Sequence, residues 1–454
     1  MKQGWHTVTE ESVLFLSIAK WVVLASIIGS IVGITSSLFL KILSSSLVLT
    51  SGFSYSYLFL PIALFLSNLI IYYISPDSEG HGTEKVISAI HRRGGDMRFR
   101  VVPIKLVATI ITLASGGSAG KEGPCAQIGA ALSSCIAKLC RFSQEDRKKL
   151  VICGISAGFS AVFGTPIAGA IFGVEVLFVG SLMYGVLLPS FVAGMVSYQV
   201  ASLMGIPYDY VAINLIPSFS PKLFLLIVII GCLFGIISVI FIKILETGNY
   251  WSKKITLWPP LKGFIGGIVL VVIGWGISTD YLGLGLETIE ATLHGQDVIW
   301  YAAIIKMITT AITLGFGGSG GILTPIFFVG VTSGSLLGSL MGLPIETMAA
   351  IGLVSLLAGA ANTPLAACIL AVELFGPEIA TYATISAVIS FLMTGYHSVF
   401  PSQVLAFSKA PGILVKTGQE VEGTEIHMDY KTRKVFGRGR HIVKQQFKRF
   451  WRKR

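Results

Sequence analysis

The chain has 454 residues, of which 53% are hydrophobic and only 13% are charged. A soluble domain of ordinary composition carries about a quarter charged residues. The composition therefore excludes a soluble globular protein. It predicts a membrane protein that crosses the bilayer several times, because its apolar runs approach the roughly 20 residues that one helical crossing needs.

The net charge of +11 is concentrated at the C-terminal end, since residues 431–454 contain eleven Lys and Arg and no Asp or Glu. A basic segment after the last span predicts a cytoplasmic C-terminus. It also predicts attraction to anionic lipid headgroups. Nucleic-acid binding is the alternative, and nothing else in the sequence favours it. The chain is expected to be a multi-pass protein of the cell membrane.

Apolar runs and polar breaks divide the chain into predicted segments. The main segments of the first half are predicted, in chain order, at 13–48, 57–74, 101–114, 126–140 and 150–163. The last two are too short to span a bilayer as straight helices, so they should be buried in protein or line a cavity. The predicted parts are a polar N-terminus (1–12), a first membrane repeat (13–205), a second membrane repeat (206–405) and a basic cytoplasmic tail (406–454).

Two stretches of the first half return in the second half. Residues 116–124 match 317–325 position for position at an offset of 201, and residues 164–175 match 362–373 at an offset of 198. Each stretch is a break before a short apolar helix. Repeats with broken helices place a small-solute site at the repeat interface in membrane proteins. The predicted fold class is an all-α polytopic membrane protein built from two repeats of broken and tilted helices.

The chemistry of these breaks favours an anion. A helix N-terminus presents unpaired N–H groups and about half a positive charge. Glycines let the backbone approach a small ion, and Pro suits the first helical turn. Two such termini that converge within the membrane would bind a small anion in preference to a metal ion or a neutral sugar.

Glu122 is the notable residue of the first break, because the second break has Leu323 at the matching position. An acidic side chain within the membrane costs about 2.5–3.5 kcal/mol on insertion scales and usually marks an ion or proton pathway. Its carboxylate could occupy the place of the anion and leave it when protonated. The alternative is a glutamate that only complements a helix dipole. For Lys121, a salt bridge and a surface position are equally expected.

No metal site, cofactor or disulfide framework is predicted. The six cysteines stand in apolar contexts, without a Cys-x-x-Cys pair or a histidine at ligand spacing. An enzyme is not expected either. Ser118 and Ser319 at the breaks lack a nearby His or Asp partner that could activate them.

These residues resemble the CLC family of chloride channels and chloride/proton antiporters, in its prokaryotic form without CBS domains. Residues 120–124 fit the family's Gly-Lys/Arg-Glu-Gly-Pro signature, and 321–325 fit Gly-x-Phe-x-Pro with Leu323 in place of Phe. Residues 80–84 correspond to Gly-Ser-Gly-Ile-Pro with three changes. The resemblance covers roughly residues 15–405. It implies an all-helical homodimer with two inverted repeats and one anion pathway in each subunit.

The resemblance also implies a site. Glu122 would be the external gate, above a central anion site lined by the backbone amides of Ile322 and Leu323. The expected anion-binding residues are His81, Gly82, Gly120, Lys121, Gly123, Pro124, Gly321, Ile322, Leu323 and Gln403.

Three departures bear on the mechanism. His81 replaces the inner serine, and a neutral imidazole N–H can donate to chloride as a hydroxyl does. Gln403 falls near the position of the inner tyrosine, with Tyr396 as a weaker candidate. Val176 replaces the glutamate that carries protons in many antiporters of the family. The neighbouring Glu175 and its repeat partner, Glu373, are predicted to be structural and to bind backbone N–H groups.

The predicted function is chloride transport gated by Glu122, as a passive channel or a chloride/proton antiporter. Val176 favours weak proton coupling, because valine cannot carry a proton. A fluoride exporter of the same family is the first alternative, since that branch also departs at the serine and tyrosine positions. A transport-inactive membrane scaffold that acts through its basic tail is an alternative of another class. The expected partners are a small anion, protons, the lipid bilayer and a second copy of the chain.

Overall fold

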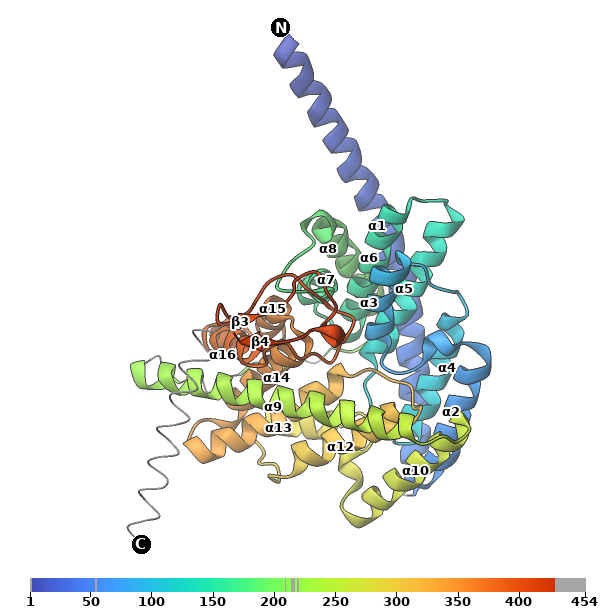
Figure 1. Ribbon diagram of the computed structural model, residues 1–454, viewed down its shortest axis with the longest axis vertical. Coiled ribbons are helices and arrows are strands. Elements are labelled where there is room, and N and C mark those ends of the chain that lie inside the picture. Colours follow the sequence, from blue (N-terminus) through green and yellow to red (C-terminus); the bar gives the residue numbers. More distant parts are fainter. Residues whose placement is uncertain (1, 54, 209, 214–216, 219, 429–454) are drawn as a thin grey trace.

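The computed structural model describes residues 2–53, 55–208, 210–213, 217–218 and 220–428. Its described part is mostly helical (Figure 1). The helices of the first half are α1 (Lys2–Ser51), α2 (Leu60–Ile74), α3 (Gly82–Arg93), α4 (Val101–Ala114), α5 (Glu122–Leu139), α6 (Gln144–Phe163), α7 (Pro166–Glu175) and α8 (Leu187–Leu203). Those of the second half are α9 (Pro221–Lys254), α10 (Pro259–Gly276), α11 (Leu286–Leu293), α12 (Ala302–Gly315), α13 (Leu323–Met341), α14 (Ile345–Ala361), α15 (Pro364–Phe375) and α16 (Ala380–Met393).

The strands are short, with two residues each, and Val179 of the first and Leu405 of the second are buried in the core. β1 (Phe178–Val179) pairs in parallel with β2 (Val404–Leu405), with Phe178 opposite Val404. β3 (Ile413–Leu414) pairs antiparallel with β4 (His427–Met428). The linker between α8 and α9 contains the boundary predicted between residues 205 and 206, and that boundary stays a prediction.

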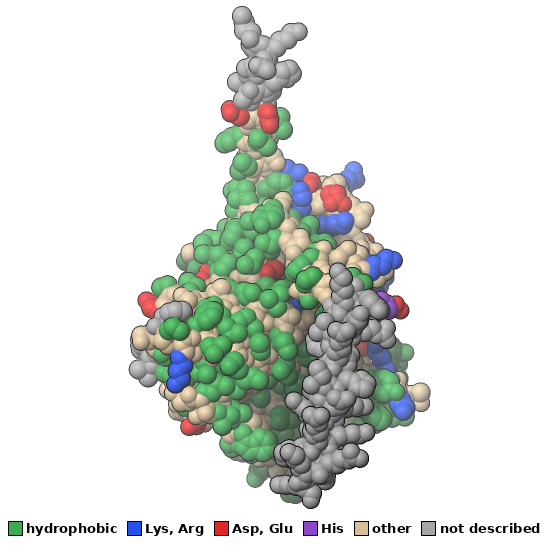
Figure 2. All heavy atoms as spheres, turned by 60° about the vertical axis from the view of Figure 1, so that its left-hand side comes forward, with side chains coloured by type: hydrophobic (Ala, Val, Ile, Leu, Met, Phe, Trp, Pro, Cys, Tyr) green, Lys and Arg blue, Asp and Glu red, His purple; other side chains and the backbone are tan. Residues whose placement is uncertain are grey.

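Six helical ranges among the described residues are long and apolar enough to cross a membrane. Figure 2 shows the apolar side chains that cover one face of the molecule. α13 differs from the other five ranges, because 78% of its apolar window is buried, against at most 44% in the others. α13 is therefore an internal helix, and it carries the second Gly-rich break at its N-terminal end.

The two halves use the same close helix contact. A Cβ on Gly129 of α5 would lie 2.4 Å from the carbonyl oxygen of Gly154 on α6. A Cβ on Gly330 of α13 would lie 2.5 Å from the carbonyl oxygen of Gly352 on α14. Small residues let helices approach closely where lipid leaves no hydrophobic force to drive them together. The repeat found in the sequence is thus a repeat in packing as well.

The halves are joined by two reciprocal carboxylate caps. Glu175, at the end of α7, accepts the N–H groups of Leu365 and Ala366 of α15 at 3.0 and 2.8 Å. Glu373, on α15, accepts those of Ile167 and Ala168 of α7 at 3.0 and 2.7 Å. Each carboxylate satisfies N–H groups that the first helical turn leaves unpaired. The predicted binding of both glutamates to backbone N–H groups is confirmed.

The segment that follows α16 folds back onto α3. The guanidinium of Arg92 donates two hydrogen bonds to the carboxylate of Glu420, one of them 2.8 Å from Nε to Oε1. β2 holds the same segment against β1. The basic cluster at 431–454, predicted to be cytoplasmic and to meet lipid headgroups, lies outside the described residues.

We expect Glu175→Gln and Glu373→Gln each to lower the stability of the protein. Gln keeps the shape of the side chain but removes the charge and one of the two acceptors. A hydrogen bond to a charged group is worth about 1.5–3 kcal/mol. Thermal unfolding in detergent measures the effect, with Glu378→Gln at an exposed position as the control. Unfolding temperatures equal to that of the control would show that the caps are not needed.

We also expect acid to loosen the segment around Glu420. The Arg92 hydrogen bond lowers the pKa of Glu420 below its ordinary value of 4.5. Because the folded pKa is the lower one, the pair stabilises the fold above the unfolded pKa. That contribution is lost as the pH falls through the folded pKa.

Hydrogen exchange of residues 419–424, corrected for intrinsic rates, should therefore rise at low pH. The rise should be smaller in Glu420→Gln, which has no carboxylate to protonate. The effect should be modest, because both side chains are partly exposed. Identical pH profiles in the two proteins would contradict the expectation.

Candidate functional site

The two Gly-rich breaks meet through their backbones. The N–H of Gly120 donates to the carbonyl oxygen of Gly321 at 2.8 Å, and the N–H of Gly321 donates to that of Gly120 at 2.6 Å. At both positions a side chain would collide with the Glu122 carboxyl in the place that it occupies here. A Cβ would come within 2.1 Å of Glu122 Oε1 at Gly120 and within 2.5 Å of it at Gly321. The N-termini of α5 and α13 therefore converge on one point.

A third helix N-terminus joins them. His81, the residue before α3, forms a parallel backbone bridge with Gly320. The first residue of α3, Gly82, lies so close to α5 that a Cβ there would be 2.5 Å from the carbonyl oxygen of Gly123. Three helix N-termini with their unpaired N–H groups thus surround one small volume, which is an arrangement that attracts an anion.

Glu122 begins α5, but its carboxylate lies at the N-terminus of α13. It is only 1% exposed. Its Oε1 accepts the N–H of Thr324 at 2.9 Å, and its Oε2 accepts the hydroxyl of the same residue at 2.7 Å. A carboxylate is itself an anion, so Glu122 stands where the helix N-terminus would hold a transported ion.

Thr324 was missed by the sequence reasoning. It is the second residue of α13 and matches Gly123 of the first break. The sequence did offer one signal. Of the two breaks, the second lacks the glutamate and has a hydroxyl residue next to the matching position. Its role as a partner depends on the two breaks facing one another, which no local pattern reveals.

The other predicted residues of the breaks surround this carboxylate. Ile322 precedes α13 and Leu323 begins it, and both side chains are buried. Gly123 and Pro124 follow Glu122 in the first turn of α5. Lys121 and Thr324 contribute to the wall of a cavity of about 250 Å³ that Tyr208 and Glu290 also line. Two residues next to the Glu122 carboxylate therefore border an open space: its partner Thr324 and the preceding residue Lys121.

His81 has an unused polar atom. Its Nδ1 is buried and has no hydrogen-bond partner among the described residues. The ring packs against that of Phe400, with 5.7 Å between their centroids. A buried polar atom without a partner is costly, so such an atom beside a site points to a ligand or a bound water. Its binding of an anion stays a prediction.

Gln403 lies in a filled hydrogen-bond network. Its Nε2 donates to the carbonyl oxygens of Val176 and Ala361, each at 2.8 Å. Its Oε1 accepts from the hydroxyl of Ser398 at 2.6 Å and from the amide of Asn362 at 3.2 Å. Both donors of the amide are engaged, so binding an anion would require one of these bonds to break.

Tyr396, the weaker candidate for the inner tyrosine, is engaged elsewhere. Its hydroxyl lies 2.9 Å from the hydroxyl of Ser408 and accepts the N–H of Lys409 at 2.9 Å. The side chain therefore holds the segment after α16 in place. Val176 is buried at the end of α7 and, as an alkyl side chain, has no group that carries a proton.

Two buried lysines fix the loops that lead into the short helices. Lys105 on α4 donates to the carbonyl oxygen of Gly80 at 2.5 Å. Lys306 on α12 donates to that of Gly283 at 2.8 Å. The two lysines are 201 residues apart, like the two breaks. The loop before α3 and the loop before α11 are thus held by the same device.

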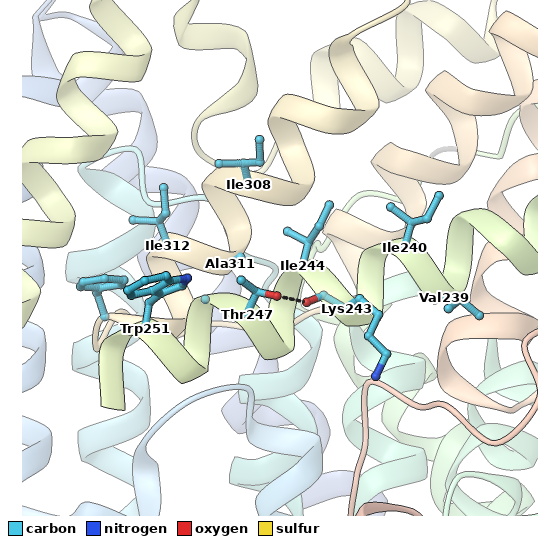
Figure 3. Close-up of a pocket in the computed structure, with 11 residues that line it drawn as sticks. Val239, Ile240, Lys243, Ile244, Thr247, Trp251, Ile308, Ala311 and Ile312 are labelled. Atoms are coloured by element: carbon cyan, nitrogen blue, oxygen red, sulfur yellow. Dashed lines mark hydrogen bonds between the residues drawn. The ribbon is translucent and has the colours of Figure 1, made fainter. Parts of the chain in front are cut away.

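An apolar groove lies apart from this site (Figure 3). It has a volume of about 580 Å³ and is lined by α9 and α12, with Trp251 at one end. Lys243, its only charged lining residue, forms an ion pair with Glu246 at 2.7 Å. No predicted site residue lines this groove, so the chemistry of the breaks is separate from it.

Comparison with known proteins agrees with this geometry. A family model described as the voltage gated chloride channel matches residues 62–395. The chloride/fluoride channel protein of Pseudomonas syringae pv. tomato is 34% identical over 399 residues, which are 86% of this chain and 88% of that protein. An uncharacterized protein of Methanocaldococcus jannaschii is 28% identical over 389 residues, 85% of this chain and 96% of that one.

Solved structures share the fold. A CLC-type fluoride/proton antiporter superposes with a TM-score of 0.82 at 28% identity, over 86% of this chain and 99% of its own. A slow cyanobacterial Cl−/H+ antiporter superposes with a TM-score of 0.72 at 19% identity, over 82% of this chain and 94% of its own. The predicted all-α polytopic membrane fold of two inverted repeats is confirmed. With a family model that covers most of its length and a relative above 30% identity along most of both chains, this protein belongs to the voltage-gated chloride channel family, the CLC family.

Proposed function

We propose that this chain moves a small anion, chloride in the first place, across the membrane through the point where α3, α5 and α13 meet, with Glu122 as the gate. The observation that carries the proposal is the carboxylate of Glu122 bound to both the N–H and the hydroxyl of Thr324. Helix N-termini attract an anion without a cationic side chain in direct contact with it. The ion is thus bound weakly enough to leave again.

The gate acts by competition. As a carboxylate, Glu122 fills the anion place at the start of α13. Protonation removes its negative charge and weakens its charge-assisted bonds to Thr324, because such bonds are about twice as strong as neutral ones. The side chain can then leave, and a transported anion takes its place. Each opening therefore involves one proton, which favours an anion/proton antiporter over a passive channel.

Fluoride is the second candidate substrate. The relative from Pseudomonas syringae is described as a chloride/fluoride channel protein, and the structure with a TM-score of 0.82 is a fluoride/proton antiporter. His81 in place of the inner serine adds a specific difference within the site itself. Parallel flux measurements with chloride and fluoride decide between the two ions.

A transport role without catalysis is part of the proposal. The serines of the breaks pair with threonines of the opposite half, with 2.9 Å between the hydroxyls of Ser118 and Thr310 and 3.0 Å between those of Ser319 and Thr109. They join the halves instead of facing a base. The homodimer, the cell-membrane location and the cytoplasmic C-terminus belong to the same proposal. They rest on family membership and on the positive charge of the tail.

Glu122→Gln should make anion flux independent of pH and abolish coupled proton movement, because the amide carries no charge to neutralise. Liposomes loaded with chloride or fluoride, with an anion electrode and a pH electrode outside, measure both ions together. Glu246→Gln, on the exposed face of α9, is the control. A variant that keeps the pH dependence of the wild type would refute the gate. A well-folded wild type that moves neither ion would favour the membrane scaffold.

Thr324→Val should raise anion flux at neutral pH by up to about tenfold. The substitution keeps the shape and the backbone N–H but removes one donor to the Glu122 carboxylate, and about 1.4 kcal/mol corresponds to tenfold. The same liposome assay measures the change. Thr332→Val, further along α13, removes a hydroxyl that donates to the carbonyl oxygen of Phe328, and serves as the matched control. Equal flux in both variants would mean that the hydroxyl does not hold the gate.

A further inference from the structure

A second carboxyl lies close to the meeting helices, and the sequence reasoning gave it no role. Glu84 is the third residue of α3 and is partly buried. The N–H of Ser402 lies 3.2 and 3.3 Å from its two oxygens, and the Ser402 hydroxyl donates to Oε1. No basic side chain of the described residues forms an ion pair with it, in contrast to the paired Glu79 and Glu420 nearby. The carboxyl is therefore partly withdrawn from water without a compensating cation.

The neighbours of Glu84 connect it with both the gate and the position of Val176. Two residues before it, Gly82 touches the backbone of Gly123, the neighbour of Glu122. In the other direction its partner Ser402 precedes Gln403, whose amide binds the carbonyl oxygen of Val176. Glu84 is thus linked, through its chain neighbour Gly82 and its partner Ser402, to both ends of the route that a proton would have to take.

The carboxyl of this motif is buried in the first repeat but not at the matching position of the second repeat. Residues 283–287 read Gly-Leu-Gly-Leu-Glu and match Gly-His-Gly-Thr-Glu at 80–84. Lys306 and Lys105 bind the carbonyl oxygens of the first glycines of the two stretches, Gly283 and Gly80. Yet Glu287 is exposed, whereas Glu84 is covered by Ser402 and the segment after α16. The repeated motif does not itself require a buried carboxyl.

We propose that Glu84 is the proton-transfer residue on the side of the C-terminal segment, where it exchanges protons with Glu122 in place of a carboxyl at position 176. The inference rests on the proposed proton coupling. In each cycle the protonated Glu84 gives up its proton toward the Glu122 carboxylate and is reprotonated from the side of the C-terminal segment. His81, whose Nδ1 has no partner among the described residues, precedes α3 three residues before Glu84.

The surroundings of Glu84 suit a group that titrates near neutrality. α3 is outside the helical ranges that could cross a membrane. The pKa of Glu84 is raised to about 7: burial is the main cause, the hydrogen bonds from Ser402 oppose it, and the carboxylates of Glu422 and Glu420 add to the rise. The charged or titratable neighbours on α3 and the C-terminal segment are His81, Lys85, Arg92, Glu420 and Glu422. Arg92 and Glu420 form an ion pair, so their effects on Glu84 largely offset one another.

The alternative role for Glu84 is a purely structural one, as the attachment of Ser402 to α3. Ser402→Ala separates the two roles, because it removes the hydroxyl donor but leaves the carboxyl and the backbone N–H. If Glu84 only attaches the segment, Glu84→Gln and Ser402→Ala should lower the unfolding temperature alike and leave the ratio of protons to anions unchanged.

The test uses the full chain in liposomes with a chloride or fluoride gradient, and records proton uptake and anion efflux together. Glu84→Gln should lower anion-driven proton uptake at least tenfold while anion efflux continues. Glu84→Asp, which keeps a carboxyl, should retain proton uptake at a reduced rate. Glu287→Gln, the repeat-related substitution at the exposed position, should behave as the wild type.

The outcomes distinguish this inference from the proposed function. A wild type that moves anions without any proton movement would overturn the proposed coupling and the role of Glu84 with it. A coupled wild type together with a Glu84→Gln variant of unchanged proton-to-anion ratio would overturn the role of Glu84 alone. If Glu84→Gln fails to fold, Glu84→Asp serves as the test. Proton uptake in that variant equal to the uptake of the wild type over the whole pH range would count against a role of Glu84 in proton transfer.

Discussion

The backbone pair between Gly120 and Gly321 is the contact on which the site depends. Its two hydrogen bonds hold the breaks of the two halves edge to edge, so that α5 and α13 begin at one place. A side chain on either glycine would collide with the Glu122 carboxyl, which fills the space beside both. The electrostatics of the site follow from this geometry, since the positive ends of helices act only over their first turn.

The two halves share a backbone plan but divide the chemistry. The first break supplies the carboxyl of Glu122, and the second supplies Leu323 at the same position and therefore no competing charge. The hydroxyl of Thr324 stands where the first break has Gly123. One half thus provides the carboxylate and the other provides the donors that bind it. A site built from two identical breaks would carry two carboxylates that repel one another.

The sequence predicts features that are repeated or local, and it misses those that depend on distant contacts. The two breaks, the position of Glu122 and the backbone partners of Glu175 and Glu373 follow from repeat matching and helix chemistry. Thr324 binds a residue 202 positions away, and Ser402 covers Glu84 from 318 positions away. Gln403 was expected to donate to an anion, yet its amide is already engaged by protein groups. Composition and periodicity carry no information about such pairings.

The exchange of caps between α7 and α15 has a consequence for the origin of the chain. Glu175 of one half binds the N-terminus of the other half's helix, and Glu373 returns the same contact. A contact in which each partner offers the other the same patch is the kind that a two-fold axis generates. Two separate copies of a single ancestral half, inserted in opposite directions, would make it without any change of sequence. A duplicated and fused gene thus inherits an interface that already fits.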